Sequence, residues 1–320
     1  MRILSGIQPS GAMHIGNYFG AVKPIISSQD SGELFAFIAS YHAMTSVKDK
    51  DILRQNIFDT AVNFLSLGLN PDKAIFYRQH DVPQVLELYW ILSILTPMAM
   101  LERGHSYKDK VAKGIKSSHG LFSYPVLMAA DILLFDANIV PVGKDQTQHI
   151  EMCRDIATTF NDRFGDILTI PKIKIEQNTQ TVIGTDGAKM SKSYNNTINM
   201  FDTEKKLKKQ IMNIKTDSKG IHEPKDYKTC SIYKLCELFM SKNELIQLQQ
   251  RYINKTEGYG HFKQTLYEIV QKYFAAYKNK REHYLKNPDE VEHMLQSGAA
   301  KAKAKATKKL ETIRQAVGLN

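Results

Sequence analysis

The first half of the chain alternates short apolar runs with longer segments in which apolar residues recur at helical spacing. The short runs predict strands and the longer segments predict helices, which together indicate a parallel sheet with helices on both faces. Such sheets bind ligands beyond the carboxyl ends of their strands, so we expect a site at the loops after Ile7 and Val142. The predicted strands are Arg2–Ile7, Leu34–Ala39, Ala74–Tyr77 and Asn138–Val142, and the predicted helices are Tyr18–Ile26, Ile52–Leu67, Val85–Leu95 and Gln146–Phe164.

The pattern changes after a loop rich in Gly, Thr, Asn and Asp at residues 177–196. Beyond this loop the segments are mostly amphipathic helices. We therefore expect an α/β domain with a parallel sheet over residues 1–196 and a smaller all-helical domain over residues 197–320. The last helix of the second domain can pack back on the first. Its predicted helices are Glu204–Met212, Tyr233–Met240, Glu244–Tyr252, Phe262–Tyr277 and one or two long helices over Pro288–Val317.

Charge and composition narrow the classes of function. The formal net charge of +10 favours a polyanionic partner such as nucleic acid, although charges tuned for solubility are the alternative. The hydrophobic fraction of 42% is ordinary for a soluble protein, and no apolar run is long enough to span a bilayer. The three cysteines form no C-x-x-C pair, which favours buried thiols over a disulfide framework or a zinc site. We expect a cytoplasmic protein without metal ligands.

The turn after the first predicted strand carries the first candidate chemistry. Gly6 to Gly11 leads into Met13-His14-Ile15-Gly16-Asn17, which opens a helix. Small residues let a ligand approach the backbone, and the N–H groups at a helix start bind anions such as phosphate. His14 adds a hydrogen-bond donor beside that position. On its own the motif is also compatible with an ordinary strand-to-helix turn that bears a surface histidine.

A second candidate lies far downstream, in Lys189-Met190-Ser191-Lys192-Ser193. Two lysines that flank a Met-Ser step, in a loop with several glycines and asparagines, can close over a triphosphate, because lysine is a flexible point charge suited to phosphates. Read alone, the segment could be a solvated loop end. Together, the turn and this lysine loop resemble the two signatures of the class I aminoacyl-tRNA synthetases.

Further motifs resemble the bacterial tryptophanyl-tRNA synthetases more than the tyrosyl enzymes. They are the segments 5–11 and 14–18, Tyr124 to Leu133 and Val140 to His149. The similarity covers most of residues 1–200 and implies a Rossmann-like catalytic domain followed by a helical domain that binds tRNA. It further implies a homodimer with L-tryptophan, ATP, Mg²⁺ that accompanies ATP, and the tryptophan tRNA as partners.

The resemblance also assigns residues to the nucleotide. Val182 or Ile183 should present its backbone to adenine, and the variable length of the loop leaves that alignment open by one residue. Lys110 matches a phosphate-binding lysine, although a solvated charge run is the alternative. The implied catalytic residues are His14, Lys110, Lys189 and Lys192. The implied ATP-binding residues are Gln8, Pro9, Ser10, Gly16, Asn17, Gly143, Lys144, Asp145, Val182, Ile183, Lys189, Met190, Ser191, Lys192 and Ser193.

Asp131 can be argued from its surroundings. It lies in the otherwise apolar segment Met128–Phe135, where a buried carboxylate needs a donor. The indole of tryptophan carries one polar group, an N–H that only donates, so a lone acceptor in an apolar slot complements it. A structural aspartate at a helix start is the alternative, and core packing is the alternative for the apolar residues. The tryptophan-binding residues implied by the resemblance are Asp131, Tyr124, Gln146, Met128, Gly6, Leu4, His42, Val140 and Val142.

The implied reaction joins tryptophan to its tRNA through an adenylate and releases AMP and pyrophosphate. The alternatives are a tyrosyl-tRNA synthetase, a small-molecule adenylyltransferase and a non-catalytic RNA-binding paralogue. The last should have lost His14 or the lysine loop, and both are present. Two groups of basic residues are candidates for the tRNA surface, and solvated helix faces are the alternative reading. They are Lys205, Lys206, Lys208, Lys209 and Lys215, and then Lys301, Lys303, Lys305, Lys308, Lys309 and Arg314.

Overall fold

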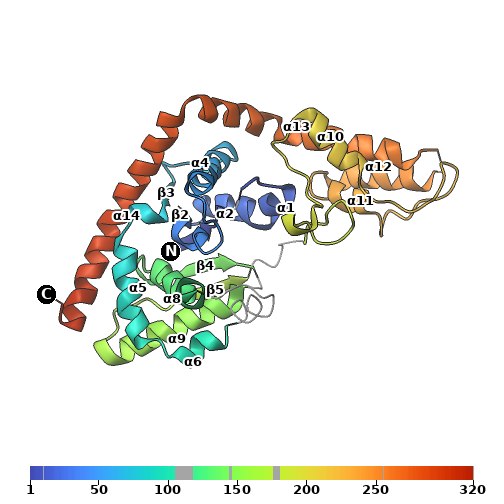
Figure 1. Cartoon of the computed structure of the whole chain (residues 1–320). Coiled ribbons are helices and arrows are strands. Elements are labelled where there is room, and N and C mark those ends of the chain that lie inside the picture. Colours follow the sequence, from blue (N-terminus) through green and yellow to red (C-terminus); the bar gives the residue numbers. More distant parts are fainter. Residues whose placement is uncertain (10, 105–117, 144–145, 176–180, 255, 320) are drawn as a thin grey trace. The chain divides into compact units, whose positions relative to one another are not determined.

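The structure, a computed structural model, describes residues 1–320 except 10, 105–117, 144–145, 176–180, 255 and 320 (Figure 1). The chain divides into two compact units. The first comprises Met1–Gly11, Ile25–Gln177 and Tyr284–Asn320, and the second comprises Ala12–Pro24 and Asn178–His283. This division differs from the predicted boundary at residue 196, since residues 12–24 and the lysine loop belong with the helical unit, while the last helix is grouped with the sheet, an arrangement that the sequence prediction allowed.

The first unit is built on a five-stranded parallel sheet in the order β3-β2-β1-β4-β5, which confirms the predicted fold class. The sequence pattern places four of the strands within a residue of their observed bounds. It misses β5, a four-residue edge strand whose Lys-Ile-Lys-Ile alternation is a short signal. The strands are β1 (Arg2–Ile7), β2 (Glu33–Ile38), β3 (Ala74–Arg78), β4 (Ile139–Val142) and β5 (Lys172–Ile175).

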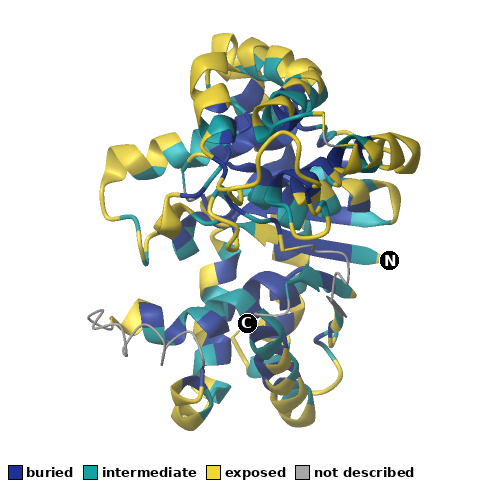
Figure 2. Cartoon of the chain, turned by 90° about the vertical axis from the view of Figure 1, so that its right-hand side faces the viewer, coloured by how far each residue is buried: buried dark blue, intermediate teal, exposed yellow. Residues whose placement is uncertain are grey.

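Helices cover both faces of the sheet. On one face, α4 packs through Phe64, whose ring stacks on Phe76 of β3 with 5.6 Å between centroids. On the other face, four helices share one core with Leu4, Phe35 and Val140 of the strands. Most residues of β2 and β3 are buried, whereas β4 is mostly half-buried (Figure 2). The helices are α4 (Lys50–Ser66), α5 (Gln84–Leu95), α8 (His119–Leu133), α9 (Thr147–Phe164) and α14 (Pro288–Val317).

The last helix, α14, packs closely against the edge strand β3. A Cβ atom on Gly298 would lie 1.9 Å from the carbonyl oxygen of Phe76, so only glycine allows this approach. The lysine-rich face predicted as a candidate for RNA is partly occupied by ion pairs. Lys305 pairs with Glu33 at 2.6 Å, Lys309 with Asp136, and Arg314 with Glu87. These cations fasten the helix to the sheet unit.

The second unit is helical and has an aromatic core. Tyr18 meets Phe274 with 5.3 Å between ring centroids, and Tyr252 stacks on Phe262 at 3.9 Å. Four of its helices lie where the sequence predicts them: α10 has the predicted bounds, and α11, α12 and α13 have shifted ends. Its helices are α1 (Ile15–Asn17), α10 (Glu204–Met212), α11 (Ser231–Cys236), α12 (Lys242–Ile253) and α13 (Tyr259–Lys286), whose last residues belong to the first unit.

The predicted helix over Tyr18–Ile26 is interrupted in the structure. Pro24 has no N–H to donate, and the segment forms a π-helical turn before a short α-helix. The remaining short elements are η1 (Tyr18–Val22), α2 (Lys23–Ser27), η2 (Ser28–Asp30), α3 (Ser40–Ala43), η3 (Gln79–Asp81), α6 (Met98–Glu102) and η5 (Lys192–Tyr194). Over the described ranges, no helix is both long enough and apolar enough to cross a membrane.

Candidate active site

The carboxyl ends of the strands in the first unit form the expected binding edge. The chain progresses outward from β1 through β2 to β3, and then returns to place β4 on the other side of β1. The strand order therefore reverses between β1 and β4, which is where open parallel sheets bind ligands. The two loops singled out from the sequence, after Ile7 and after Val142, follow these two strands.

Asp131 is buried near this edge, on α8, with 3% of its surface exposed. Contrary to the prediction of a lone acceptor, two side chains contact its carboxylate. Gln79 Nε2 donates to both carboxylate oxygens at 2.8 and 2.9 Å, and His42 Nε2 lies 2.8 Å from Oδ2. Burial raises the pKa of the Asp131 carboxyl, while the bonds from His42 and Gln79 act against that rise. The site thus holds a buried carboxyl group with two side-chain hydrogen-bonding partners.

Helix α8 places three predicted pocket residues on one face. Tyr124, Met128 and Asp131 follow one another at spacings of four and three, which brings them into line along the helix. The Tyr124 hydroxyl lies 2.6 Å from Nε2 of the buried His149 on α9. The sequence reasoning missed this helix, together with His149 and Gln79. The spacing of the three residues was the signal that could have revealed the common face.

The remaining predicted tryptophan residues lie in the first unit with different surroundings. Leu4 and Val140 are buried in the main core, as expected from the alternative in which these residues serve core packing. Val142 is half-buried and packs against the same core. Gly6 lies against the ring of Phe37. The structure therefore brings His42 and Asp131 into direct contact, and assigns Leu4 and Val140 at least a packing role.

The N-terminal turn belongs to the second unit from Ala12 onward. His14 is the N-cap of α1, and its Nδ1 accepts the backbone N–H of Asn17 at 3.2 Å. Because Nδ1 is an acceptor here, the neutral ring carries its proton on Nε2 and can donate from that atom. Burial and the nearby Lys192 lower the pKa of His14 to about 4, so the ring is neutral at physiological pH.

The lysine loop is a tight hairpin. Ile183 and Lys189 form an antiparallel bridge, which is closed by Met190 N–H to Val182 O at 2.8 Å and Gly184 N–H to Ala188 O at 2.7 Å. In such a pair the peptide groups of Ile183 point away from Lys189. The carbonyl of Val182 is already occupied, so Ile183 is the residue whose backbone faces outward.

Asn196, which the sequence reasoning left without a role, holds this hairpin in shape. It is buried, its Oδ1 accepts the N–H of Ser191 at 2.7 Å, and its Nδ2 donates to the carbonyl of Lys189 at 3.0 Å. Its side-chain amide thus spans the segment that carries the two lysines. Ser191 in turn caps the short turn η5 by accepting the N–H of Ser193.

The second unit brings the turn and the loop together although about 175 residues separate them in the chain. The N–H of Ile15 donates to the carbonyl of Ile198 at 2.9 Å. A Cβ on Gly16 would lie 2.9 Å from His14 Nδ1 and 3.3 Å from Met190 Cβ, so the small residue permits this approach. The two predicted signatures are therefore neighbours in one compact unit.

Several predicted residues are placed elsewhere or are not described. Ser10, Lys110, Lys144 and Asp145 lie outside the described residues. Gln8 belongs to the first unit and donates to the carbonyl of His42 at 3.2 Å. The last group consists of residues of the first unit near the ends of β1 and β4. They are Pro9, which is buried, and Gly143 and Gln146, which are half-buried.

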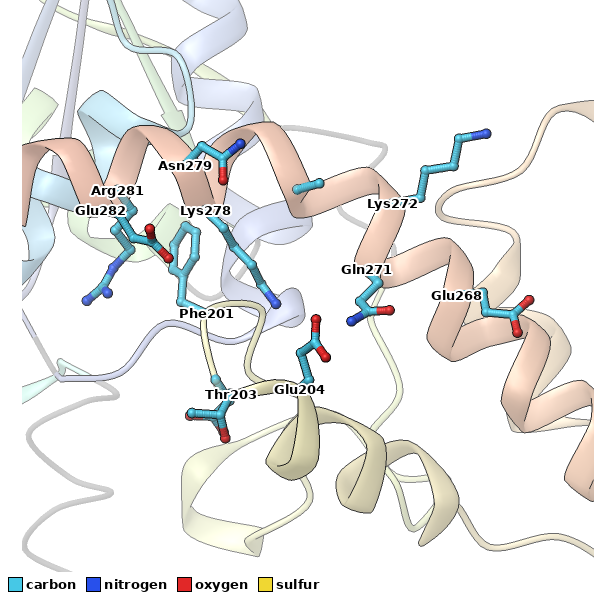
Figure 3. A pocket seen from close by; sticks show the side chains of 12 residues that line it. Phe201, Thr203, Glu204, Glu268, Gln271, Lys272, Lys278, Asn279, Arg281 and Glu282 are labelled. Carbon is cyan, nitrogen blue, oxygen red and sulfur yellow. The ribbon is translucent and has the colours of Figure 1, made fainter.

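A cavity of about 790 Å³ lies in the second unit, between α13 and the residues that lead into α10 (Figure 3). Its lining includes Phe201, Glu204, Gln271 and Lys278, and Arg281 lies over the Phe201 ring at 5.1 Å. Carboxylates and cations both line it. None of the predicted site residues borders this cavity, so it does not coincide with the predicted active site.

Comparisons with known proteins identify the family. A family model of class I tRNA synthetases (W and Y) matches residues 1–275. The tryptophan–tRNA ligase of Campylobacter jejuni strain RM1221 is 54% identical over the full length of both chains. The chain belongs to this class I synthetase family. The resemblance drawn from the sequence motifs is thereby confirmed.

Other relatives of this synthetase family agree over the same length. The tryptophan–tRNA ligase of Fusobacterium nucleatum is 49% identical and is aligned over 99% of this chain and 98% of its own. The crystal structure of the Campylobacter jejuni tryptophanyl-tRNA synthetase, complexed with ADP and tryptophan, superposes with a TM-score of 0.96 at 54% identity, covering 100% of both chains. The similarity thus includes the helical second unit, for which the sequence motifs offered only length and helical character.

Proposed function

We propose that this chain ligates L-tryptophan to its cognate tRNA through a tryptophanyl-adenylate formed from ATP. The observation that carries the proposal is the buried carboxylate of Asp131 near the carboxyl edge of the sheet, to which Gln79 donates and next to which His42 Nε2 lies. An apolar pocket with one acceptor complements the indole ring and its single N–H. The binding of ADP and tryptophan by the Campylobacter jejuni relative supports the same substrates here.

The amino-acid end of tryptophan lies, in this proposal, toward Tyr124 and Gln146. The hydroxyl of Tyr124 is held by His149, which fixes the ring at the face of α8 that also carries Asp131. The indole lies farther along that face, bordered by Met128 and His42. This orientation directs the carboxylate of tryptophan toward the loops that follow β1 and β4.

The nucleotide is bound by the N-terminal turn and the lysine hairpin. The outward peptide groups of Ile183 suit the edge of adenine, whereas the carbonyl of Val182 is engaged within the hairpin. The Nε2–H of the neutral His14 and the ammonium groups of Lys189 and Lys192 suit the phosphates. Mg²⁺ prefers phosphate oxygens, and the described residues contain no cluster of three metal-binding side chains, so we place the ion on ATP itself.

The first step needs placement rather than a base. The tryptophan carboxylate is already ionised and attacks the α-phosphate, so the bond to pyrophosphate breaks and charge develops on that leaving group. The neutral His14 donates from Nε2, and the two lysines place positive charge beside the departing phosphates. In the second step the terminal ribose hydroxyl of tRNA accepts the tryptophanyl group, and AMP leaves.

Asp131→Ala tests the proposed function. We expect the variant to lose tryptophan activation, measured as tryptophan-dependent ATP–pyrophosphate exchange, while the KM for ATP stays within about twofold. Loss of the polar contact costs about 1–3 kcal/mol, or roughly 5- to 150-fold in kcat/KM, and lost packing adds to this. An unchanged kcat/KM for tryptophan in this variant would remove Asp131 from the pocket, and absence of exchange by the wild-type chain would refute the function.

The tRNA should contact α10 rather than α14. Lys205, Lys206, Lys208 and Lys209 are exposed, and within the described part of the chain none of them forms an ion pair, whereas three cations of α14 are paired. Replacing these four lysines of α10 with glutamine should weaken tRNA charging and flatten its salt dependence, because fewer counterions are released. Adenylate formation needs no tRNA and should be unaffected.

The measurement compares aminoacylation with ATP–pyrophosphate exchange over a series of salt concentrations. A matched control replaces Lys301, Lys303 and Lys308 of α14 with glutamine, which removes exposed charge and leaves the ion pairs of that helix intact. The prediction is wrong if the control variant loses tRNA charging while the α10 variant retains it with an unchanged salt dependence. In that case the tRNA binds along α14.

We also propose that the enzyme is a cytoplasmic homodimer that associates through α5. Leu86, Trp90 and Ile94 recur every four residues along this helix, and Trp90 and Ile94 are 64% and 69% exposed. An apolar face of this kind is unfavourable in water and fits a second copy of the same surface. Met98, also exposed, extends the face beyond the helix end.

Ile94→Asp should therefore shift the protein from dimer to monomer in sedimentation velocity, because a carboxylate would be buried against an apolar partner surface. Ile246→Asp is the matched control, since Ile246 is an exposed isoleucine on α12 of the other unit. A dimer that survives Ile94→Asp places the interface elsewhere, and a wild-type monomer rejects the dimer.

A further inference from the structure

Gln79 is buried and contacts Asp131 of α8 from the end of β3. It begins the turn η3, directly after β3, and only 1% of its surface is exposed. Its Nε2 reaches both carboxylate oxygens of Asp131. Since 52 residues separate the two side chains, their contact depends on how α8 packs near the end of β3 and not on proximity in the sequence. Nothing in the sequence motifs pointed to this residue.

The orientation of the Gln79 amide is fixed by a third residue. The backbone N–H of Tyr41 donates to Gln79 Oε1 at 2.9 Å. A backbone N–H can only donate, so Oε1 must face Tyr41 and the NH₂ group must face Asp131. If the amide were flipped, Nε2 would face the N–H of Tyr41, which is also a donor. Oε1 would then face the carboxylate of Asp131, which is also an acceptor.

This arrangement determines which hydrogen bond Asp131 can still form. The amide nitrogen of Gln79 lies within hydrogen-bond distance of both oxygens, and His42 Nε2 lies 2.8 Å from Oδ2. Of the described residues, only Gln79 bonds to Oδ1, so Oδ1 keeps a lone pair for a ligand. A carboxylate in this environment accepts and does not donate.

We propose that Gln79 is the positioning and specificity-determining residue of the pocket, which holds Asp131 as an acceptor-only carboxylate that selects a ring N–H. The inference rests on the proposed function. Its ligand class is an aromatic amino acid whose ring donates one hydrogen bond. A ring of the same shape with sulfur or oxygen in place of the N–H offers a lone pair to a lone pair, and the pocket rejects it.

The first test compares L-tryptophan with 3-(3-benzothienyl)alanine, in which sulfur replaces the indole N–H. Wild-type enzyme should favour tryptophan by about 10²-fold or more in kcat/KM, since the isostere leaves a buried polar group unpaired. Gln79→Met removes this donor and leaves His42 as the remaining side-chain partner of Asp131 among the described residues. It should lower kcat/KM for tryptophan by about tenfold or more, narrow the preference, and leave the KM for ATP unchanged.

Gln79→Glu distinguishes positioning from simple packing. The variant keeps an acceptor for Tyr41 but sets a second carboxyl against Asp131, and such a pair shares a proton. The shared proton lies between the two carboxyls and replaces the amide donor, so Asp131 still accepts at low pH. At high pH the two carboxylates repel each other and displace Asp131, so the preference for tryptophan should fall as pH is raised from 6 to 9. Wild-type enzyme and Gln79→Met should keep a pH-independent preference. The other titratable groups that face Asp131 are His42 of α3 and Tyr77 of β3, and both variants retain them.

Gln84→Met is the control for loss of a glutamine hydrogen bond in the same unit, because Gln84 donates to Thr307 and does not contact Asp131. It should retain the wild-type preference. The inference is overturned if both Gln79 variants keep the wild-type preference at every pH while Asp131→Ala abolishes it. The inference is also overturned if the wild-type enzyme has nearly the same kcat/KM for tryptophan and for 3-(3-benzothienyl)alanine. Failure of the proposed function is distinct, since the wild-type chain would then show no tryptophan-dependent exchange.

Discussion

His14→Ala should lower kcat for tryptophan-dependent ATP–pyrophosphate exchange by about 10²- to 10³-fold, with a smaller change in the KM for ATP. Loss of one donor aimed at developing negative charge has an effect of this size. The donor is Nε2 of a neutral ring, because Nδ1 accepts the N–H of Asn17 and the pKa of His14 is lowered to about 4. An interaction made mainly in the transition state appears in kcat rather than in KM.

His14→Asn separates the two functions of this side chain. Asparagine is a good N-cap and can accept the N–H of Asn17 through its own oxygen, so the thermal stability of the variant should match that of wild type. It lacks a donor at the position of Nε2, so its kcat should stay as low as that of His14→Ala. Wild-type activity in His14→Asn would show that the histidine acts only as a helix cap.

The pH dependence of stability follows from the same pKa. The folded pKa of about 4 lies below the ordinary value of 6.5, so as pH falls the proton binds first to the unfolded chain. The stability contributed by neutral His14 is complete above about pH 6.5 and is lost as the pH falls from there toward 4. His14→Asn removes this dependence, and denaturant titrations between pH 7 and 4 should show a shallower loss of stability than in wild type.

Four of the five strands of the sheet could be predicted because they are short apolar runs bounded by polar loops, and β1 has the predicted bounds. Helix α8 could not, for two physical reasons. Most of its faces are buried, which removes the amphipathic period, and Pro125 lies inside it, where a proline normally argues against a helix. As a result Asp131 was found as an isolated residue, and the helix face it shares with Tyr124 and Met128 was not.

The partners of predicted residues were the harder part. The chemistry of Asp131 pointed to a buried acceptor, but Gln79 reaches this residue of α8 from the end of β3, and no local pattern encodes that contact. The lysines of α14 illustrate the same limit. Lys305 and Lys309 resemble other exposed lysines in the sequence, and only the fold brings Glu33 and Asp136 beside them.

The remaining prediction concerns Lys192, whose replacement by alanine should lower kcat by about 10²-fold with little change in the KM for ATP. Although the residue is exposed as a whole, partial burial of its ammonium group lowers the pKa of Lys192. It lies close enough to His14 to lower the pKa of that ring as well. A cation held in this position by the turn η5 is placed to meet charge on the departing pyrophosphate. Lys219→Ala, which removes another exposed lysine of the same unit, should leave kcat unchanged.

The double variant His14→Ala, Lys192→Ala decides whether the two side chains act on the same charge. When two residues act on the same partner, the double variant loses less kcat than the product of the two single losses. When they act independently, the two fold-losses multiply. We expect the double variant to be at most about tenfold slower than the worse single variant, against a further 10²-fold for independent action. Multiplicative losses would place Lys192 on a different part of the triphosphate from His14. A Lys192 effect confined to the KM for ATP would make the loop an ordinary binding element, since the cation would then stabilise bound ATP and its transition state equally.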